Sequence, residues 1–238
     1  MDEYILKGIK DFDENYKVVT EKLSEAAVKS GRAPSDITLL AATKTVEVPV
    51  INHAYESGIK VMGENRVQEF LSKENELAQG LRRQFIGTLQ TNKVRQIVGK
   101  VELIQSVDSI KLANEIAKQS IARNIVTNVL VEINIGKEES KSGINEENLD
   151  EFLCQLSTIE GIFVKGLMTL GPVNDELTQK IAYFDKMQKL FIDNKAKKVD
   201  NISMDILSMG MSHDFDIAIL HGANMVRVGT SLFGSRIY

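Results

Sequence analysis

Residues 37–44 read ITLLAATK, an almost wholly apolar run that ends in a lysine. Such a continuous apolar run is typical of a strand buried on both faces, the usual state of a strand in a parallel sheet. Burial at the end of that strand would disfavour the ammonium form of Lys44, and a neutral lysine amine is a nucleophile that forms Schiff bases with aldehydes. The alternative interpretation is that Lys44 only extends out of the sheet end into water.

From residue 37 onward, apolar strand patterns alternate with helical patterns. The expected strands begin near Ile37, Ile59, Arg83, Val101, Thr127, Ile162, Ile202 and Asn224, and the expected helices between them cover residues 48–57, 67–79, 91–99, 109–122, 146–159, 175–195 and 212–221. Eight strand–helix units predict an α/β fold, a closed (β/α)8 or TIM barrel. A doubly wound open sheet would carry a Gly-x-Gly-x-x-Gly turn after an early strand, and the sequence has none.

Residues 4–30 precede the barrel and carry apolar side chains at steps of three and four, which predicts one long amphipathic helix. Gly31 and Pro34 are typical of the chain just past a helix end. We expect a single domain over residues 1–238, with residues 1–34 packed as a helix on a barrel of residues 37–234. The alternative is that the apolar stripe, which includes Phe12, forms a coiled-coil dimer; we expect a monomer.

Composition and charge exclude several classes of protein. The 238 residues carry 29 Lys and Arg against 33 Asp and Glu, a formal net charge of −4, and no basic stripe predicts nucleic-acid binding. No stretch approaches the about 20 apolar residues needed to span a bilayer, and the N-terminus lacks a signal-peptide pattern. The single cysteine, Cys154, cannot form an internal disulfide and is expected as a small buried thiol. We therefore expect a cytoplasmic protein without a metal site.

The expected carboxyl ends of the last two strands are rich in glycine and hydroxyl groups. They read SMG at residues 208–210 and GTS at residues 229–231. Many barrels bind phosphate with these two loops, using backbone N–H groups beside glycine. We expect Ser208, Met209, Gly229 and Thr230 to form such a site. The alternative is that Ser212 caps the following helix and the glycines only form tight turns.

Arg227 lies two residues before Gly229 on the same expected strand, so both face the same side. If that side is the barrel interior, Arg227 approaches the mouth at which Lys44 ends; the alternative is an ion pair with a core carboxylate such as Asp205. An imine-forming lysine, a phosphate site and a cation between them are the parts of a pyridoxal 5′-phosphate (PLP) site. An aldolase for phosphorylated sugars would need similar parts and also a general acid–base in the barrel.

Seven segments together resemble a known family. They are LLAATK at 39–44, GENRVQE at 63–69, FIGTLQTNK at 85–93, SKSG at 140–143, GLMT at 166–169, LSMGMS at 207–212 and VRVGT at 226–230. By these segments the chain resembles the pyridoxal phosphate homeostasis proteins, the YggS/PROSC family. The resemblance implies a barrel like the N-terminal domain of alanine racemase, PLP fold type III. Gln84 departs from the pattern, because many members carry histidine there; we expect changed hydrogen bonding around the site and unchanged cofactor binding.

The resemblance also implies roles for individual residues. It places PLP as a Schiff base on Lys44, Asn65 beside the cofactor and Arg227 opposite the pyridine nitrogen. Ser208, Gly229 and Thr230 would contact the phosphate.

The function that follows is a non-catalytic PLP-binding protein that buffers or hands on the cofactor and supports amino-acid and keto-acid balance. PLP-dependent apo-enzymes are its candidate partners. Lys137 and Lys141 are candidates for transient contact with the aldehyde, with a surface role as the alternative.

The rival function is a cryptic racemase or decarboxylase. It would need a tyrosine acid–base, but the tyrosines at 4, 16, 55, 183 and 238 avoid the strand-end motifs. It would also need a second domain, and only residues 233–238 follow the last expected strand. His213 remains a candidate beside the phosphate site. A third possibility is an interaction protein that uses the N-terminal stripe and dissociates when Phe12 is made charged.

Overall fold

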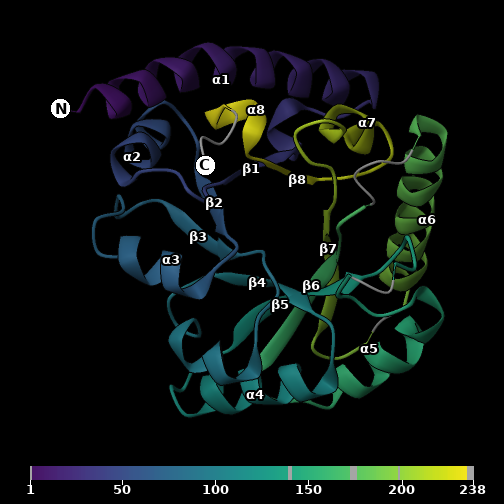
Figure 1. Cartoon of the computed structure of the whole chain (residues 1–238). Helices are drawn as coiled ribbons and strands as arrows, with labels where there is room; N and C mark the ends of the chain where they lie inside the picture. Colours follow the sequence, from purple (N-terminus) through teal and green to yellow (C-terminus); the bar gives the residue numbers. More distant parts are fainter. Residues whose placement is uncertain (1, 139–140, 172–175, 198, 235–238) are drawn as a thin grey trace.

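The computed structural model describes residues 2–138, 141–171, 176–197 and 199–234. Its eight parallel strands follow one another in chain order around a closed barrel, as the alternating pattern predicts (Figure 1). The strands are β1 Thr38–Ala42, β2 Val61–Glu64, β3 Arg82–Phe85, β4 Leu103–Val107, β5 Thr127–Ile133, β6 Ile162–Thr169, β7 Ile202–Ser208 and β8 Met225–Val228. Strands β8 and β1 close the barrel, with Leu40 paired to Arg227, so the open-sheet alternative is wrong.

Helices cover the outside of the barrel. The α-helices are α1 Glu3–Lys29, α2 Val48–Glu56, α3 Val67–Lys73, α4 Ile110–Ile121, α5 Leu149–Ser157, α6 Leu177–Lys195, α7 Phe215–Leu220 and α8 Thr230–Phe233. Three short 3-10 helices are η1 Pro34–Asp36, η2 Thr91–Gln96 and η3 Glu146–Asn148. The helix expected over 91–99 is therefore a 3-10 helix. The one expected over 67–79 ends at Lys73, and Leu77 beyond it belongs to a buried cluster with Ile51 and Met62.

The strand that opens the barrel is shorter than the sequence suggests. We expected Lys44 as its last residue, but β1 ends at Ala42. Thr43, Lys44 and Thr45 form a turn in which the N–H of Val46 donates to Thr43 O, and Thr45 has a φ of 66°. That left-handed conformation cannot continue a strand. Lys44 therefore lies in the loop above the strand end.

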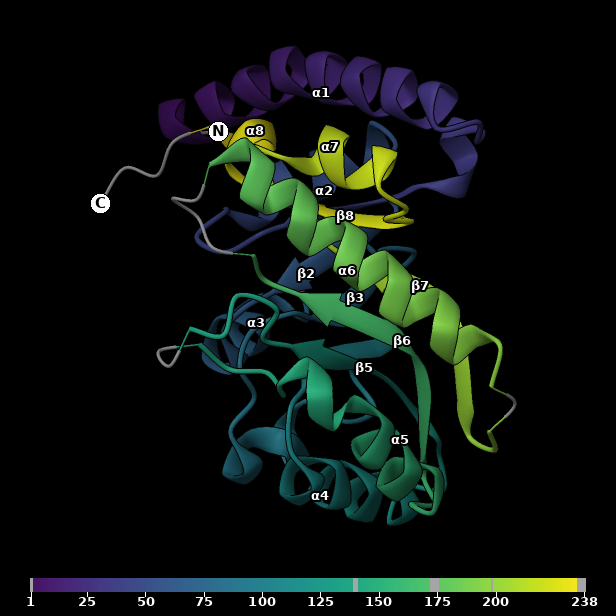
Figure 2. The same cartoon turned by 90° about the vertical axis from the view of Figure 1, so that its right-hand side faces the viewer.

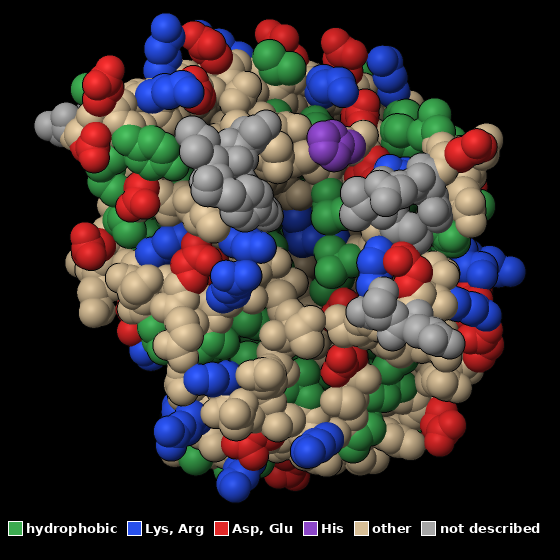
Figure 3. Space-filling view, viewed as in Figure 1, with side chains coloured by type: hydrophobic (Ala, Val, Ile, Leu, Met, Phe, Trp, Pro, Cys, Tyr) green, Lys and Arg blue, Asp and Glu red, His purple; other side chains and the backbone are tan. Residues whose placement is uncertain are grey.

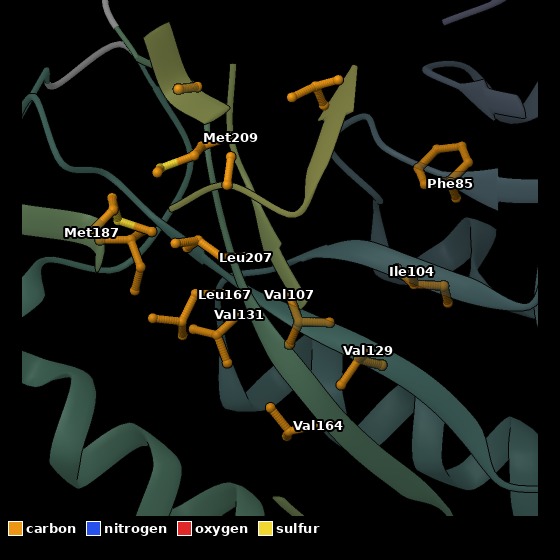
Figure 4. Close-up of a cluster of buried hydrophobic side chains, with 14 of the residues drawn as sticks. Phe85, Ile104, Val107, Val129, Val131, Val164, Leu167, Met187, Leu207 and Met209 are labelled. Carbon is orange, nitrogen blue, oxygen red and sulfur yellow. The ribbon is translucent and has the colours of Figure 1, made fainter. Parts of the chain in front are cut away.

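Alternating side chains of the strands build two separate cores. Leu40, Val61, Leu103, Leu130 and Met225 belong to a cluster that fills the barrel interior. The intervening residues face the helices and form the larger outer core (Figure 4). Side chains that alternate between interior and helix-facing layers are the expected packing of a barrel.

Helix α1 lies along one side of the barrel and packs against α2, α7 and α8 (Figures 1 and 2). Its Phe12 is fully buried, with ring centroids 5.2 Å from Tyr16 and 5.6 Å from Phe233. The buried side chains of α1 thus face this chain's own helices α2, α7 and α8.

Cys154 is exposed, so the expectation of a buried thiol is wrong. Its neighbours Phe152, Leu153 and Leu156 are buried on the barrel side of α5. A residue two positions from Phe152 and from Leu156 is rotated about 200° away from them on a helix and faces solvent.

Candidate functional site

A pocket of about 370 Å³ opens between the carboxyl ends of β1 and β8, helix α8 and the first turns of α1. Lys44, Gly229 and Thr230 line it, so the structure brings together three residues that the sequence assigns to one site. Tyr4 and Lys7 of α1 line the same pocket. Figure 3 shows this side of the molecule hollowed below α1, with Lys or Arg atoms on the floor of the hollow.

Backbone N–H groups at the start of α8 converge on one oxygen atom. The N–H groups of Gly229 and Ser231 both donate to Ser212 Oγ, each over 3.2 Å. Ser212 thus caps α8. The alternative interpretation, in which Ser212 caps the helix that follows β7, is wrong, because that helix, α7, starts only at Phe215. These donors can hold an oxygen atom, which is the property that a phosphate site requires.

Arg227 lies in the barrel interior and is almost fully buried. Its guanidinium donates to Ser208 Oγ over 2.5 Å and to Thr169 O over 2.7 Å. Burial lowers the pKa of Arg227 to about 10, while Glu132 and Asp214 favour its charged form. The alternative ion pair with Asp205 is wrong, because that exposed carboxylate lies 3.5 Å from Lys165.

A chain of hydrogen bonds runs from Arg227 across the barrel interior. Ser208 Oγ donates to Gln105 Oε1 over 2.7 Å, and Gln105 Nε2 donates to Gln84 Oε1 over 2.6 Å. Gln84 Nε2 then donates to Glu102 Oε1 over 2.7 Å. The hydroxyl hydrogen of Ser208 is therefore directed at Gln105 while its oxygen accepts from Arg227. Contact of Ser208 with a phosphate stays a prediction that requires this hydroxyl to change partner.

Met209 and Asn65 follow strands β7 and β2. The side chain of Met209 is fully buried in the outer core near Leu207 (Figure 4), so only its backbone can face a ligand. Asn65 is half-buried, and its backbone packs against Gly87, where a Cβ would lie 2.1 Å from Asn65 O. Glycine at 87 is thus required for the close approach of these two loops.

Glu132, which we did not predict, is a buried carboxyl group of β5 near Arg227. It is 2% exposed and accepts a hydrogen bond from Ser142 Oγ over 3.2 Å. Burial raises the pKa of Glu132 to about 7, with Asp108 also raising it and Ser142 and Arg227 lowering it. The sequence signal for this residue is a single acidic residue inside the apolar run 129–135.

Glu132→Gln should make the stability of the protein less dependent on pH. Because the folded state raises the pKa of Glu132 from 4.5 to about 7, the stabilisation from its bound proton is largest at low pH and is lost as pH rises through 7. The variant should gain about 2–3 kcal/mol relative to wild type between pH 5 and pH 8. Urea unfolding at both pH values measures this. Glu151→Gln, an exposed change on α5, is the control, and a parallel pH profile of wild type and Glu132→Gln would contradict the prediction.

Other candidates lie apart from the pocket. Lys137 forms an ion pair with Glu147, and Lys141 lies 2.7 Å from Glu138. The Glu147 hydrogen bond raises the pKa of Lys137, which favours the non-nucleophilic ammonium form. His213 is exposed in the loop before α7. Ser140 and Tyr238 lie outside the described residues.

The tyrosines lie closer to the site than their sequence positions suggest. Tyr4 lines the pocket of Lys44, and Tyr183 lines a narrow pocket with Arg227. Neither residue belongs to the strand-end motifs of the sequence, but helices α1 and α6 carry Tyr4 and Tyr183 to these pockets.

Within the described ranges, no cluster of His, Cys, Asp and Glu is suited to a metal ion. Among the same residues, no helix has the length and apolar character needed to cross a membrane.

The fold and the arrangement of the site define the class of the protein. The family model of the alanine racemase N-terminal domain matches residues 22–237. Alanine racemase from Clostridium difficile 630 superposes with a TM-score of 0.71 at 17% identity, over 98% of this chain and 61% of that chain, which is a likeness of fold. The barrel is therefore of the alanine racemase N-terminal type.

Relatives of higher identity narrow this class. A pyridoxal phosphate homeostasis protein from Aquifex aeolicus is 45% identical over 221 residues, covering 92% of this chain and 96% of the relative. The structure of PipY from Synechococcus elongatus PCC7942 with PLP bound is 30% identical, with a TM-score of 0.78 over 89% of this chain and 100% of that one. The chain belongs to the family of pyridoxal phosphate homeostasis proteins, as its motifs suggested.

Proposed function

We propose that this protein binds PLP and serves PLP homeostasis by buffering the cofactor and handing it on. The observation that carries the proposal is the pocket that joins Lys44 to Gly229 and Thr230. The name of the Aquifex aeolicus relative and the PLP-bound state of PipY support it.

The donor set of this chain fits a phosphorylated aldehyde of the PLP type. Lys44 supplies an amine, and the N–H groups of Gly229 and Ser231 already hold a hydroxyl oxygen. Glycine suits position 229, where a Cβ would come within 3.2 Å of Ala42 O and narrow the pocket. PLP, when bound, supplies an aldehyde that condenses reversibly with an amine. Lys44 is the amine that would carry it.

Arg227 suits a carrier, although it does not exclude catalysis. A guanidinium opposite the pyridine nitrogen disfavours protonation of that nitrogen, which weakens the ring as an electron sink. Arg227 is buried and keeps its charge near neutral pH, since its pKa is about 10.

We propose one barrel domain that acts as a cytoplasmic monomer and passes PLP to apo-enzymes, with consequences for amino-acid and keto-acid balance.

The test is an absorption spectrum of the PLP-loaded protein before and after borohydride reduction, followed by peptide mapping. Reduction should fix the chromophore on the peptide that contains Lys44 and on no other. Fixation on a different lysine, or release of all chromophore on denaturation after reduction, would reject the proposed site.

Catalysis is tested separately by incubating the loaded protein with a panel of amino acids in deuterated water. The carrier proposal expects α-proton exchange no faster than with free PLP. Faster exchange on any amino acid would establish the rival racemase or decarboxylase chemistry.

A further inference from the structure

The turn that carries Lys44 is held from both sides by helix α3. Lys73 Nζ donates to Thr43 O over 2.9 Å, and the carboxylate of Glu69 accepts a hydrogen bond from the N–H of Thr45. Thr43 O belongs to the peptide group before the Cα of Lys44, and the N–H of Thr45 belongs to the peptide group after it. Because each peptide group is planar, fixing these two atoms restricts both backbone dihedrals of Lys44.

The side chains that hold the turn are themselves joined in one network. Lys73 Nζ also contacts Glu64 Oε1 at 2.9 Å and Glu69 Oε1 at 2.7 Å, so its three hydrogens have three acceptors. Thr43 Oγ1 donates to Glu64 Oε1 over 2.9 Å. Lys73 is 8% exposed and Glu64 is fully buried.

This network offsets two local costs. Burial raises the pKa of Glu64, and the ammonium group of Lys73 opposes that shift. Thr45 has a positive φ of 66°, which is uncommon for a β-branched residue and is kept only where surrounding contacts impose it. The hydrogen bond from Thr45 to Glu69 is such a contact.

We infer that Lys73, acting with Glu64 and Glu69, is a positioning residue that fixes the backbone of Lys44 so that its amine meets the aldehyde of the cofactor in a reactive orientation. This inference rests on the proposed function, because it assigns Lys44 as the attached amine. Lys73 does not line the pocket with Lys44, Gly229 and Thr230, so it acts through the turn.

The test compares Lys73→Met and Glu69→Ala with the control Lys100→Met. Lys100 also pairs with a glutamate of the region after α3, Glu74, at 2.6 Å, but it lies on the surface. Glu69→Ala keeps the pair of Lys73 with Glu64, so it serves if Lys73→Met does not fold. Three quantities are measured: the rate of covalent attachment of PLP, the affinity for pyridoxine 5′-phosphate and the hydrogen-exchange rate of the Thr45 amide without ligand.

Both variants should attach PLP about tenfold or more slowly, since a small misplacement of a reacting group costs that much in rate. Their Thr45 amides should exchange faster. Their affinity for pyridoxine 5′-phosphate, which has the ring and phosphate but no aldehyde, should equal that of wild type, and Lys100→Met should match wild type throughout.

The positioning role would be overturned if the folded variants attached PLP at the wild-type rate while the wild-type adduct mapped to Lys44. The proposed function would stand in that case. An equal loss of affinity for pyridoxine 5′-phosphate would also overturn the positioning role, because Lys73 would then support the whole pocket. A wild-type adduct mapped to another lysine would reject the proposed function and, with it, this role.

Discussion

Lys44→Ala protein should purify without covalently held PLP, and borohydride should fix no chromophore on it. The alanine side chain offers no amine, and Lys44 lines the pocket with Gly229 and Thr230 in the loop that directly follows β1. Lys7 of α1 lines the same pocket and should not replace Lys44 as the attached amine. The phosphate donors and Arg227 remain in place, so the variant should still bind pyridoxine 5′-phosphate. Absorption spectra, mass spectrometry after reduction and calorimetric binding of pyridoxine 5′-phosphate measure these outcomes.

Lys100→Ala is the matched control for the loss of one lysine, because this residue pairs with Glu74 at the surface. It should attach PLP as wild type does. A Lys44→Ala protein with an undiminished, covalently attached chromophore would show that another amine carries the aldehyde, and the proposed site would have to be abandoned.

Phe12→Ala should strongly lower the free energy of unfolding of the protein and leave its oligomeric state unchanged. The ring of Phe12 is fully buried between α1 and the barrel and stacks on Tyr16 and Phe233. Truncation of a buried phenylalanine to alanine costs about 3–5 kcal/mol. This is a large part of the about 5–15 kcal/mol that stabilises a typical folded protein. Urea unfolding of the two proteins measures the difference.

Val18→Ala on the same helix is the control, because Val18 is 58% exposed and its truncation should change stability by at most about 0.5 kcal/mol. If Phe12→Ala or Phe12→Asp instead left the unfolding free energy unchanged and converted a dimer to a monomer in sedimentation, α1 would act as an interface between copies.

The barrel could be predicted from sequence because its evidence is local. Most strands are short runs rich in apolar residues, with β3 (RRQF) as an exception, and the long helices have their own period, so the repeated alternation is visible without knowledge of contacts. The chemistry at the mouth follows from the same pattern, since the carboxyl ends of parallel strands meet at one face. The family assignment drew on motifs at those ends and is confirmed by the relatives.

Features that depend on contacts between distant segments could not be predicted. The left-handed residue in the turn of Lys44 is Thr45, and no glycine marks it. Ser212 caps α8 through a hydrogen bond from Gly229, which lies 17 residues further along the chain. The sequence had suggested that Ser212 caps the helix directly after β7. Tyr4 reaches the pocket only because α1 lies along the barrel. Glu132 has no local signal beyond its position in an apolar run.

The amide of Gln84 completes a hydrogen-bonded path between Arg227 and Glu102 inside the barrel. Between Arg227 and Glu102 the connecting side chains are Ser208, Gln105 and Gln84, and none of them gains or loses a proton near neutral pH. The path therefore cannot relay a proton between Glu102 and the guanidinium of Arg227. A histidine in place of Gln84 would add to that path a side chain that gains and loses a proton near neutral pH.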